Sequence, residues 1–108
     1  MKQPFFSIVT PVYNGEKYIE ETIKSVLEQT ISDFEYLVVD NLSTDNTNNI
    51  ITKYSSKITK IITEKDNGMY DALKKGFSEA TGKYLFWLNA DDFLKNKNVL
   101  SKIKHINL

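Results

Sequence analysis

The adjacent carboxylates Asp91 and Asp92 are the clearest candidates for chemistry in this 108-residue sequence. Two neighbouring carboxylates repel each other, so they are most useful where a cation or hydrogen-bond donors lie between them. Their hard oxygen ligands suit Mg²⁺ or Mn²⁺. An ion with few protein ligands keeps open positions for a diphosphate, which it stabilises as a leaving group. A purely structural role, as a helix N-cap followed by an acid in the first turn, also fits the pair.

Asp40 is a second candidate, because it follows the mostly apolar run 34–39. A carboxylate at the end of a buried segment must find a donor or a ligand. Asn41 or Ser43 would supply a donor within the chain, whereas the polar edge of a base or a ribose would supply it from a ligand. The sequence favours neither interpretation.

The remaining candidates have plausible structural interpretations. Glu64 and Asp66 lie in a segment closed by Asn67-Gly68, which is typical of a solvated turn. Tyr13 either stacks on a flat base or packs at the rim of the core. The single histidine, His105, is expected in solvent on a polar helix face, so no hydrolytic triad has a plausible centre.

Hydrophobic periodicity predicts strands and helices that alternate along the chain. We expect strands at 5–10, 34–39, 58–63 and 83–88, and helices at 16–29, after 43–45, around 69–80 and near 99–106. Pro11 should end the first strand, since proline cannot donate to a ladder. Alternation at this spacing requires crossover connections. It therefore predicts an α/β fold of three layers, with a mostly parallel sheet of about four strands flanked by helices.

The predicted strand ends would bring the polar residues together. In open parallel sheets, ligands bind beyond the carboxyl ends of the strands, where the strand order reverses. The segments after the four expected strands are 11–14, 40–41, 64–67 and 89–92, and acidic residues occur in three of them. This combination predicts a binding site at one edge of the sheet.

Composition excludes several classes of function. The length corresponds to one domain, and 14 lysines balance 14 acids with no arginine, which disfavours a nucleic-acid platform. The absence of cysteine excludes thiol chemistry and cysteine-based metal sites. No apolar run approaches the roughly 20 residues of a membrane span, and we expect a cytoplasmic chain with no membrane segment.

Three segments carry a resemblance to a known family: SIVTPVYNGEKYIEETIKSVLEQT, YLVVDNLSTDNT and EKDNGMYDALKKGFSEATGKYLFWLNADD. They resemble the amino-terminal half of inverting family 2 glycosyltransferases of the GT-A fold, in particular members that build bacterial surface polysaccharides. The resemblance runs from Phe6 to about Leu94. It implies strand order 3-2-1-4 and a nucleotide-sugar donor, commonly a UDP-sugar, bound with Mn²⁺ or Mg²⁺. The acceptor, a glycan or a lipid-linked molecule, is not identified.

The resemblance also implies roles for individual residues. The strand end containing Thr10, Pro11 and Tyr13 would lie along the nucleoside, and Asp40 would meet the uracil ring. Asp66 would lie near the base and ribose. Asp91 and Asp92 match the family's DXD-like acid pair, with Asp91 near the ribose or the metal and Asp92 mainly on the metal.

The sequence departs from the family pattern at two places. Asn41-Leu42 stands where Gly or Asp and then Gly or Ser are common, and Lys74 replaces a common Asn. Family members also continue into an acceptor-binding half that supplies the general base. We therefore expect residues 1–108 to be the donor-binding domain alone, without an assigned catalytic residue and with little or no transfer activity. For the full-length parent, association with a membrane is an alternative that the sequence leaves open.

Alternative functions of other classes make different demands. A signalling receiver domain would have paired acids after its first strand, where this chain has Thr10-Pro11. A dinucleotide-binding oxidoreductase would need a Gly-rich turn there, and only Gly15 occurs. An interaction module is a third alternative, because the fourth strand would expose an apolar edge and a net charge of zero favours self-association.

Overall fold

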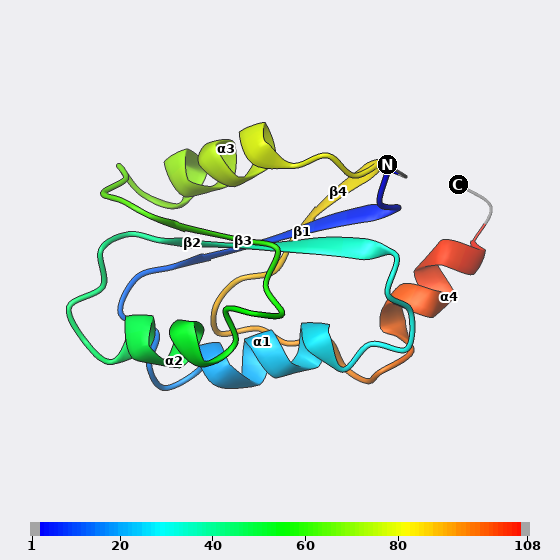
Figure 1. Ribbon diagram of the computed structural model, residues 1–108, viewed down its shortest axis with the longest axis horizontal. Coiled ribbons are helices and arrows are strands. Elements are labelled where there is room, and N and C mark those ends of the chain that lie inside the picture. Colours follow the sequence, from blue (N-terminus) through cyan, green and yellow to red (C-terminus); the bar gives the residue numbers. More distant parts are fainter. Residues whose placement is uncertain (1–2, 107–108) are drawn as a thin grey trace.

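The computed structural model describes residues 3–106, which form four strands and four helices in alternation (Figure 1). In chain order they are β1 (Phe6–Val12), α1 (Ile19–Leu27), β2 (Phe34–Asp40), α2 (Thr47–Lys53), β3 (Lys60–Thr63), α3 (Met69–Glu79), β4 (Tyr84–Trp87) and α4 (Val99–His105). The strands make one sheet of order β3-β2-β1-β4, and every pair is parallel. The predicted α/β class and strand order are confirmed.

The sheet is the middle of three layers. Helix α3 covers one face, and α1, α2 and α4 lie on the other (Figure 1). Successive side chains of a strand point to opposite faces, so Ile8 packs in the α1 and α2 core while Val9 packs beneath α3. Burial on both faces explains why β1 and β2 are apolar almost throughout.

Gly76 lets α3 approach the sheet closely. A β-carbon at this position would lie 2.5 Å from Cγ1 of Val9, and 3.3 Å from Cγ2 of Val39. The glycine thereby holds α3 against the two central strands. Since α3 begins beside the strand ends, its position sets one wall of the site described below.

The first strand is longer than predicted, because it continues through Pro11 to Val12. The carbonyl of Val9 accepts from Leu88, and that of Val12 accepts from Asn41, so odd-numbered residues of β1 face β4. Pro11 therefore faces β4, whose pairing with β1 has already ended at Val9. Its missing N–H removes no ladder hydrogen bond.

Other elements are shorter than predicted. Helix α1 begins at Ile19 because residues 16–18 form a turn, with the N–H groups of Tyr18 and Ile19 donating to the Gly15 carbonyl. Strands β3 and β4 occupy four residues each, inside the longer predicted ranges. Within residues 3–106 no helix has both the length and the apolar character needed to cross a membrane.

Candidate functional site

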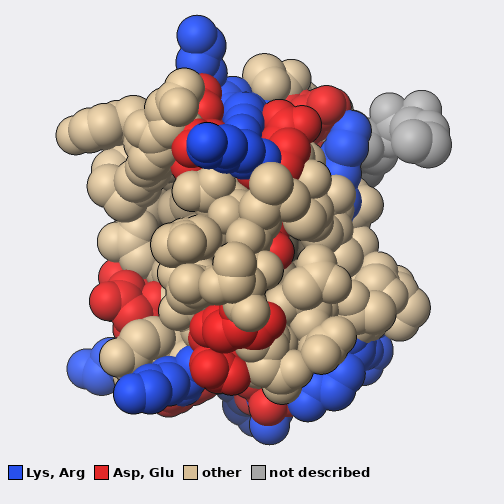
Figure 2. Space-filling view, turned by 90° about the vertical axis from the view of Figure 1, so that its left-hand side faces the viewer, with Lys and Arg blue, Asp and Glu red and all other residues tan. Residues whose placement is uncertain are grey.

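A cleft of about 300 Å³ opens at the carboxyl edge of the sheet. Segments that follow all four strands line it, together with the first residues of α3: Pro11, Val12, Tyr13, Asn41, Asp66, Gly68, Met69, Ala72 and Asn89. Figure 2 faces this edge and shows charged side chains of both signs above and below a mostly uncharged centre. The cleft thus lies where the fold class predicts a ligand.

A larger hollow of about 560 Å³ lies between the outer face of α1 and residues 93–97. Lysines and glutamates of mixed sign line it, and it lies away from the strand ends. Neither of the two buried, unpartnered carboxylate oxygens found in residues 3–106 belongs to its lining. The cleft at the strand ends is therefore the stronger candidate site.

Asp40 is 1% exposed at the end of β2, with one carboxylate oxygen satisfied and the other not. Its Oδ1 accepts the hydroxyl of Ser43 at 2.5 Å and the Ser43 N–H at 3.2 Å. Its Oδ2 is buried without a hydrogen-bond partner among the described residues. Ser43 is thus the donor within the chain, and a buried unpaired oxygen remains that costs free energy until a donor reaches it.

Asp66 is only 7% exposed, so the interpretation of this residue as part of a solvated turn was wrong. Its Oδ1 accepts the N–H of Gly68 at 2.9 Å, and its own N–H donates to Oδ1 of Asn41 at 2.8 Å. Its Oδ2 is the second buried oxygen without a partner in the described part of the chain. The 25-residue separation between Asn41 and Asp66 hid this contact from local sequence patterns.

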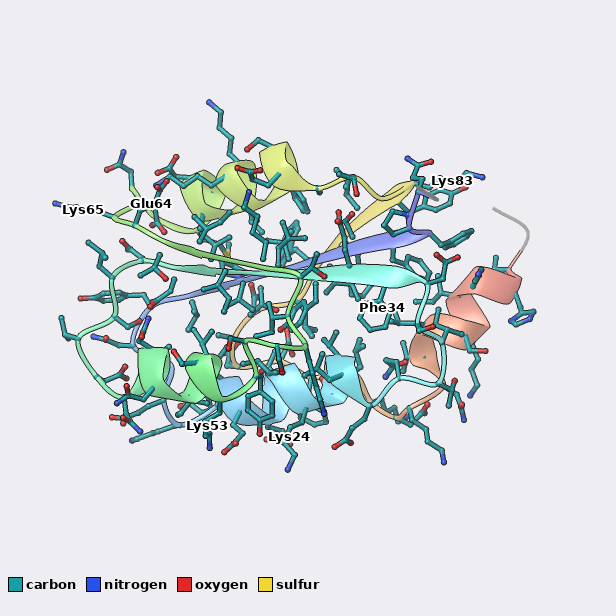
Figure 3. The ribbon with its side chains drawn as sticks, in the orientation of Figure 1. Lys24, Phe34, Lys53, Glu64, Lys65 and Lys83 are labelled. Atoms are coloured by element: carbon teal, nitrogen blue, oxygen red, sulfur yellow. The ribbon has the colours of Figure 1, made fainter. Side chains whose placement is uncertain are left out.

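Lys75 fixes the segment that carries Asp66, and sequence reasoning missed it. Its ammonium donates to the Lys65 carbonyl at 2.6 Å and forms ion pairs with Glu64 at 3.2 Å and Asp71 at 3.6 Å. Burial lowers the pKa of Lys75, but hydrogen bonding and attraction to Glu64 and Asp71 outweigh it and raise the pKa overall. Figure 3 shows Glu64 and Lys65 side by side at the tip of this connection.

Asp71 completes this arrangement from the first turn of α3. Its carboxylate accepts the Asn67 N–H at 2.9 Å, and this hydrogen bond is the main reason that its pKa is lowered. Lys75 therefore holds both sides of Asp66. It contacts Glu64 and Lys65 directly, and it is linked to Asn67 through Asp71. The spacing of Asp71 and Lys75, four residues apart on a helix, was the only sequence signal of this clamp.

Of the three residues predicted to contact a ligand at the end of β1, two line the cleft and one does not. Pro11 and the exposed Tyr13 line it, so the Tyr13 ring is available for stacking and is not packed at the core rim. Thr10 is fully buried, and its hydroxyl is hydrogen-bonded to that of Tyr36 at 2.8 Å. Burial raises the pKa of Tyr36. The Thr10 side chain faces the core, and its backbone lies in the ladder between β1 and β2, so Thr10 supports the strand end without lining the cleft.

Asn14 joins the loops after β1 and β2, and sequence reasoning missed this residue too. It adopts φ of +50°, a left-handed conformation that asparagine tolerates better than most residues. Its Oδ1 accepts the backbone N–H groups of Thr44 at 2.8 Å and Asp45 at 3.3 Å, while its own N–H donates to Ser43 Oγ at 2.8 Å. Asn14 therefore supports the same serine that binds Asp40.

Asp91 and Asp92 lie in the segment after Asn89, which lines the cleft. The hydroxyl of Thr22 on α1 donates to the carbonyls of Ala90, at 2.7 Å, and Asp92. Both aspartates are exposed, and their carboxylates make no hydrogen bond or ion pair within residues 3–106. The N-cap alternative is excluded, because α4 begins later, after Asn98.

These two carboxylates fit a divalent ion that takes few ligands from the protein. The described residues contain no group of three or more His, Cys, Asp or Glu side chains that would form a metal cage. Mg²⁺, and by the same chemistry Mn²⁺, is commonly held by one or two carboxylates together with substrate phosphates. Asp91 and Asp92 suit that mode, in which the diphosphate supplies the remaining ligands.

Comparison with known proteins gives a consistent result. The family model described as Glycosyl transferase family 2 matches residues 7–107. Among curated proteins, TuaG of Bacillus subtilis, named as a candidate teichuronic acid biosynthesis glycosyltransferase, is 37% identical over 103 residues, or 93% of this chain. The chain spans only 40% of that relative's length.

Two solved structures share the fold. Staphylococcus aureus TarS (residues 1–349) in complex with UDP-GlcNAc matches with a TM-score of 0.84 and 32% identity, covering 92% of this chain and 30% of TarS. The mannosyltransferase PcManGT of Pyrobaculum calidifontis, in complex with GDP-Man and Mn²⁺, matches with a TM-score of 0.82 and 25% identity. That match covers 94% of this chain and 31% of the mannosyltransferase.

Proposed function

The chain belongs to glycosyl transferase family 2, and on that premise we propose that residues 1–108 bind the nucleotide sugar that serves as glycosyl donor. One observation carries this proposal. Two buried carboxylate oxygens, Oδ2 of Asp40 and Oδ2 of Asp66, have no partner in residues 3–106, and Asp66 lines the cleft at the strand ends. A fold bears such a cost where a ligand supplies the missing donors.

In the proposed complex, the nucleoside occupies the cleft. The imino and hydroxyl groups of the base and ribose donate to Asp40 and Asp66, and Tyr13 stacks on the base. Asp91 and Asp92 hold Mn²⁺ or Mg²⁺ beside the diphosphate, where the ion offsets the charge that develops on the leaving group. Pro11 forms part of the wall, and Thr10 contributes by holding the end of β1 in the sheet.

A UDP-sugar is the proposed donor. TarS, a structural neighbour, is described in complex with UDP-GlcNAc, and PcManGT is described with GDP-Man and Mn²⁺. The name of TuaG supports an acceptor in surface polysaccharide synthesis, either a glycan or a lipid-linked molecule. Because the chain spans 30–40% of TarS and TuaG, we propose donor binding, with little or no transfer, as the activity of residues 1–108. A cytoplasmic location remains a prediction.

Titration with UDP and a divalent ion tests the proposal. With Mg²⁺, we expect amide shifts grouped at Thr10–Asn14, Asp40 and Asn89–Asp92. Replacing Mg²⁺ by paramagnetic Mn²⁺ should selectively broaden amides near Asp91 and Asp92. Scattered changes, or none, would contradict donor binding and favour a non-catalytic interaction domain.

The β4 edge supports self-association as a second candidate. Leu85 and Trp87 are about half exposed, and their N–H and C=O groups face away from β1, since alternate residues Tyr84 and Leu88 donate to β1. At the opposite edge, Lys60 of β3 is paired with Glu79, whereas β4 carries no charged residue. We propose that two copies pair their β4 strands in antiparallel fashion, with Phe86 opposite Phe86. This register places Leu85 of each copy opposite Trp87 of the other.

A further inference from the structure

Asn41 offers the cleft a hydrogen-bond donor of fixed direction. Its side-chain Oδ1 lies 2.8 Å from the backbone nitrogen of Asp66. A backbone N–H can only donate, so the oxygen of the amide, and not its nitrogen, must face Asp66. The two N–H donors of Nδ2 are therefore directed elsewhere. No acceptor within residues 3–106 is hydrogen-bonded to them, although Asn41 lines the cleft.

Asp66, to which Asn41 is hydrogen-bonded, lines the same cleft and carries an acceptor that also lacks a partner. Its buried Oδ2 has no hydrogen-bond partner within residues 3–106; the second such oxygen belongs to Asp40, which precedes Asn41 in the chain but does not line the cleft. A ligand that satisfies both kinds of group must present an acceptor for Asn41 next to a donor for a carboxylate. The backbone of Asn41 is itself anchored, because its N–H donates to the Val12 carbonyl at 3.0 Å.

We propose that Asn41 determines which nucleobase the cleft accepts, an inference that rests on the proposed nucleotide binding. Uracil and guanine each present a carbonyl oxygen next to an imino N–H on the base-pairing edge. Cytosine and adenine present an amino group next to a ring nitrogen that carries no hydrogen. In the same orientation, the amino group would place a donor against the Asn41 donor, and the ring nitrogen would place an acceptor against a carboxylate. The amide of Asn41 therefore selects a carbonyl and imino edge, as in UDP, and rejects CDP and ADP.

The variant Asn41→Asp separates this role from loop positioning. Its carboxylate has nearly the same shape as the amide, and one oxygen still accepts the Asp66 N–H. The other oxygen replaces the Nδ2 donor by an acceptor, which repels the uracil carbonyl and suits the cytosine amino group. UDP and CDP carry equal charge, so a general electrostatic penalty weakens both alike and cancels in their ratio of dissociation constants. Asn67→Asp, which adds the same charge at an exposed position beside Asp66, is the matched control.

Calorimetric titration of UDP, CDP, GDP and ADP with Mg²⁺ gives the test. We expect the wild type to prefer UDP over CDP at least about tenfold, and Asn41→Asp to reduce that preference about tenfold or more, while Asn67→Asp retains it. A preference for GDP over ADP that falls in the same variant supports the inference equally. An unchanged UDP to CDP ratio in Asn41→Asp, with the wild type binding UDP, overturns the role of Asn41 alone. Failure of the wild type to bind any nucleotide overturns the proposed function and this inference together.

Discussion

Ser43 donates both its hydroxyl and its backbone N–H to the same oxygen of Asp40, at 2.5 Å and 3.2 Å, and leaves the other oxygen buried without a partner in residues 3–106. The carboxylate is thus oriented by the chain but only half satisfied by it. Pairing both oxygens would have been better for stability. A group kept in this state is a candidate for ligand binding, and its substitution should affect binding more than folding.

Asp40→Asn should retain the fold and lose nucleotide affinity. The amide oxygen can still accept from Ser43, and its nitrogen replaces the unpaired oxygen and removes a buried charge. We expect the free energy of unfolding in urea to stay within about 1 kcal/mol of the wild type. We expect the dissociation constant for UDP to rise about tenfold or more, since a donor would then face the imino N–H. A variant that loses more than about 2 kcal/mol while binding UDP normally would make Asp40 structural.

Asp92→Ala should weaken the effect of the metal on nucleotide binding. The Asp92 carboxylate is exposed and makes no hydrogen bond in the described residues, so we expect unchanged stability. The gain in UDP affinity on adding Mn²⁺, measured by calorimetry, should fall about tenfold. Glu21→Ala, which removes an exposed carboxylate on α1, should retain the full gain. Equal metal dependence in Asp92→Ala and the wild type would contradict the metal role.

Leu85→Lys should convert a dimer into a monomer. A charged side chain at a sheet edge opposes pairing with another copy. Phe93→Lys is the matched control, because Phe93 and Leu85 are each 53% exposed. Sedimentation over a dilution series should show self-association in the wild type and Phe93→Lys only. In hydrogen exchange, the amides of Leu85 and Trp87 in the wild type should be protected at high protein concentration only. A wild type that stays monomeric over the dilution series would contradict pairing through β4.

Leu42→Gly should stabilise the protein. Leu42 adopts a left-handed backbone conformation, with φ of +47°, in the loop after Asp40. Its side chain is half exposed, so burial offsets little of the cost of this conformation. This conformation costs a non-glycine residue about 1–2 kcal/mol, part of which glycine loses again through greater freedom when unfolded. We expect a net gain of about 0.5 kcal/mol in urea unfolding. Leu42→Ala retains the β-carbon and should show no such gain; an equal gain in both variants would exclude backbone strain as the cause.

Glu35→Gln should reduce the dependence of stability on pH. Burial raises the pKa of Glu35, but hydrogen bonds from Ser7 and Thr81 outweigh it and hold the pKa below its ordinary 4.5. The stabilisation by the ionised form is therefore present above pH 4.5 and is lost as the pH falls through the lower value of the folded state. At pH 7 the variant should be about 1–3 kcal/mol less stable in urea unfolding, with the difference shrinking toward pH 3.

A matched control for this prediction is Glu79→Gln. Glu79 forms an exposed ion pair with Lys60, which is worth about 0–1 kcal/mol at most sites of this kind. We expect its substitution to leave the acid limb of the stability profile nearly unchanged. Parallel profiles for Glu35→Gln and the wild type would show that Glu35 does not couple folding to pH.

Much of the architecture could be predicted from the sequence, because strand and helix periodicity are local properties. The alternation of apolar segments predicted the α/β class, and the resemblance to the family supplied the strand order. Polar residues were also found at the strand ends, since parallel strands connected by crossovers end at one edge. The predicted end of the first strand at Pro11 was wrong. A proline fits inside β1 only because the pairing of β4 with β1 has already ended at Val9, and this is not visible in the sequence.

The tertiary structure decided which of these polar residues are buried and which hydrogen-bonding groups are left over. Asp66 has the sequence context of a solvated turn, and it became buried through contacts with Asn41, 25 residues away, while Lys75 on α3 pins the loop around it. Thr10 looked accessible at a strand end, but Tyr36 on the adjacent strand holds its hydroxyl in the core. Burial and hydrogen-bond pairing depend on segments that meet only when the chain folds, so periodicity along the sequence cannot reveal them.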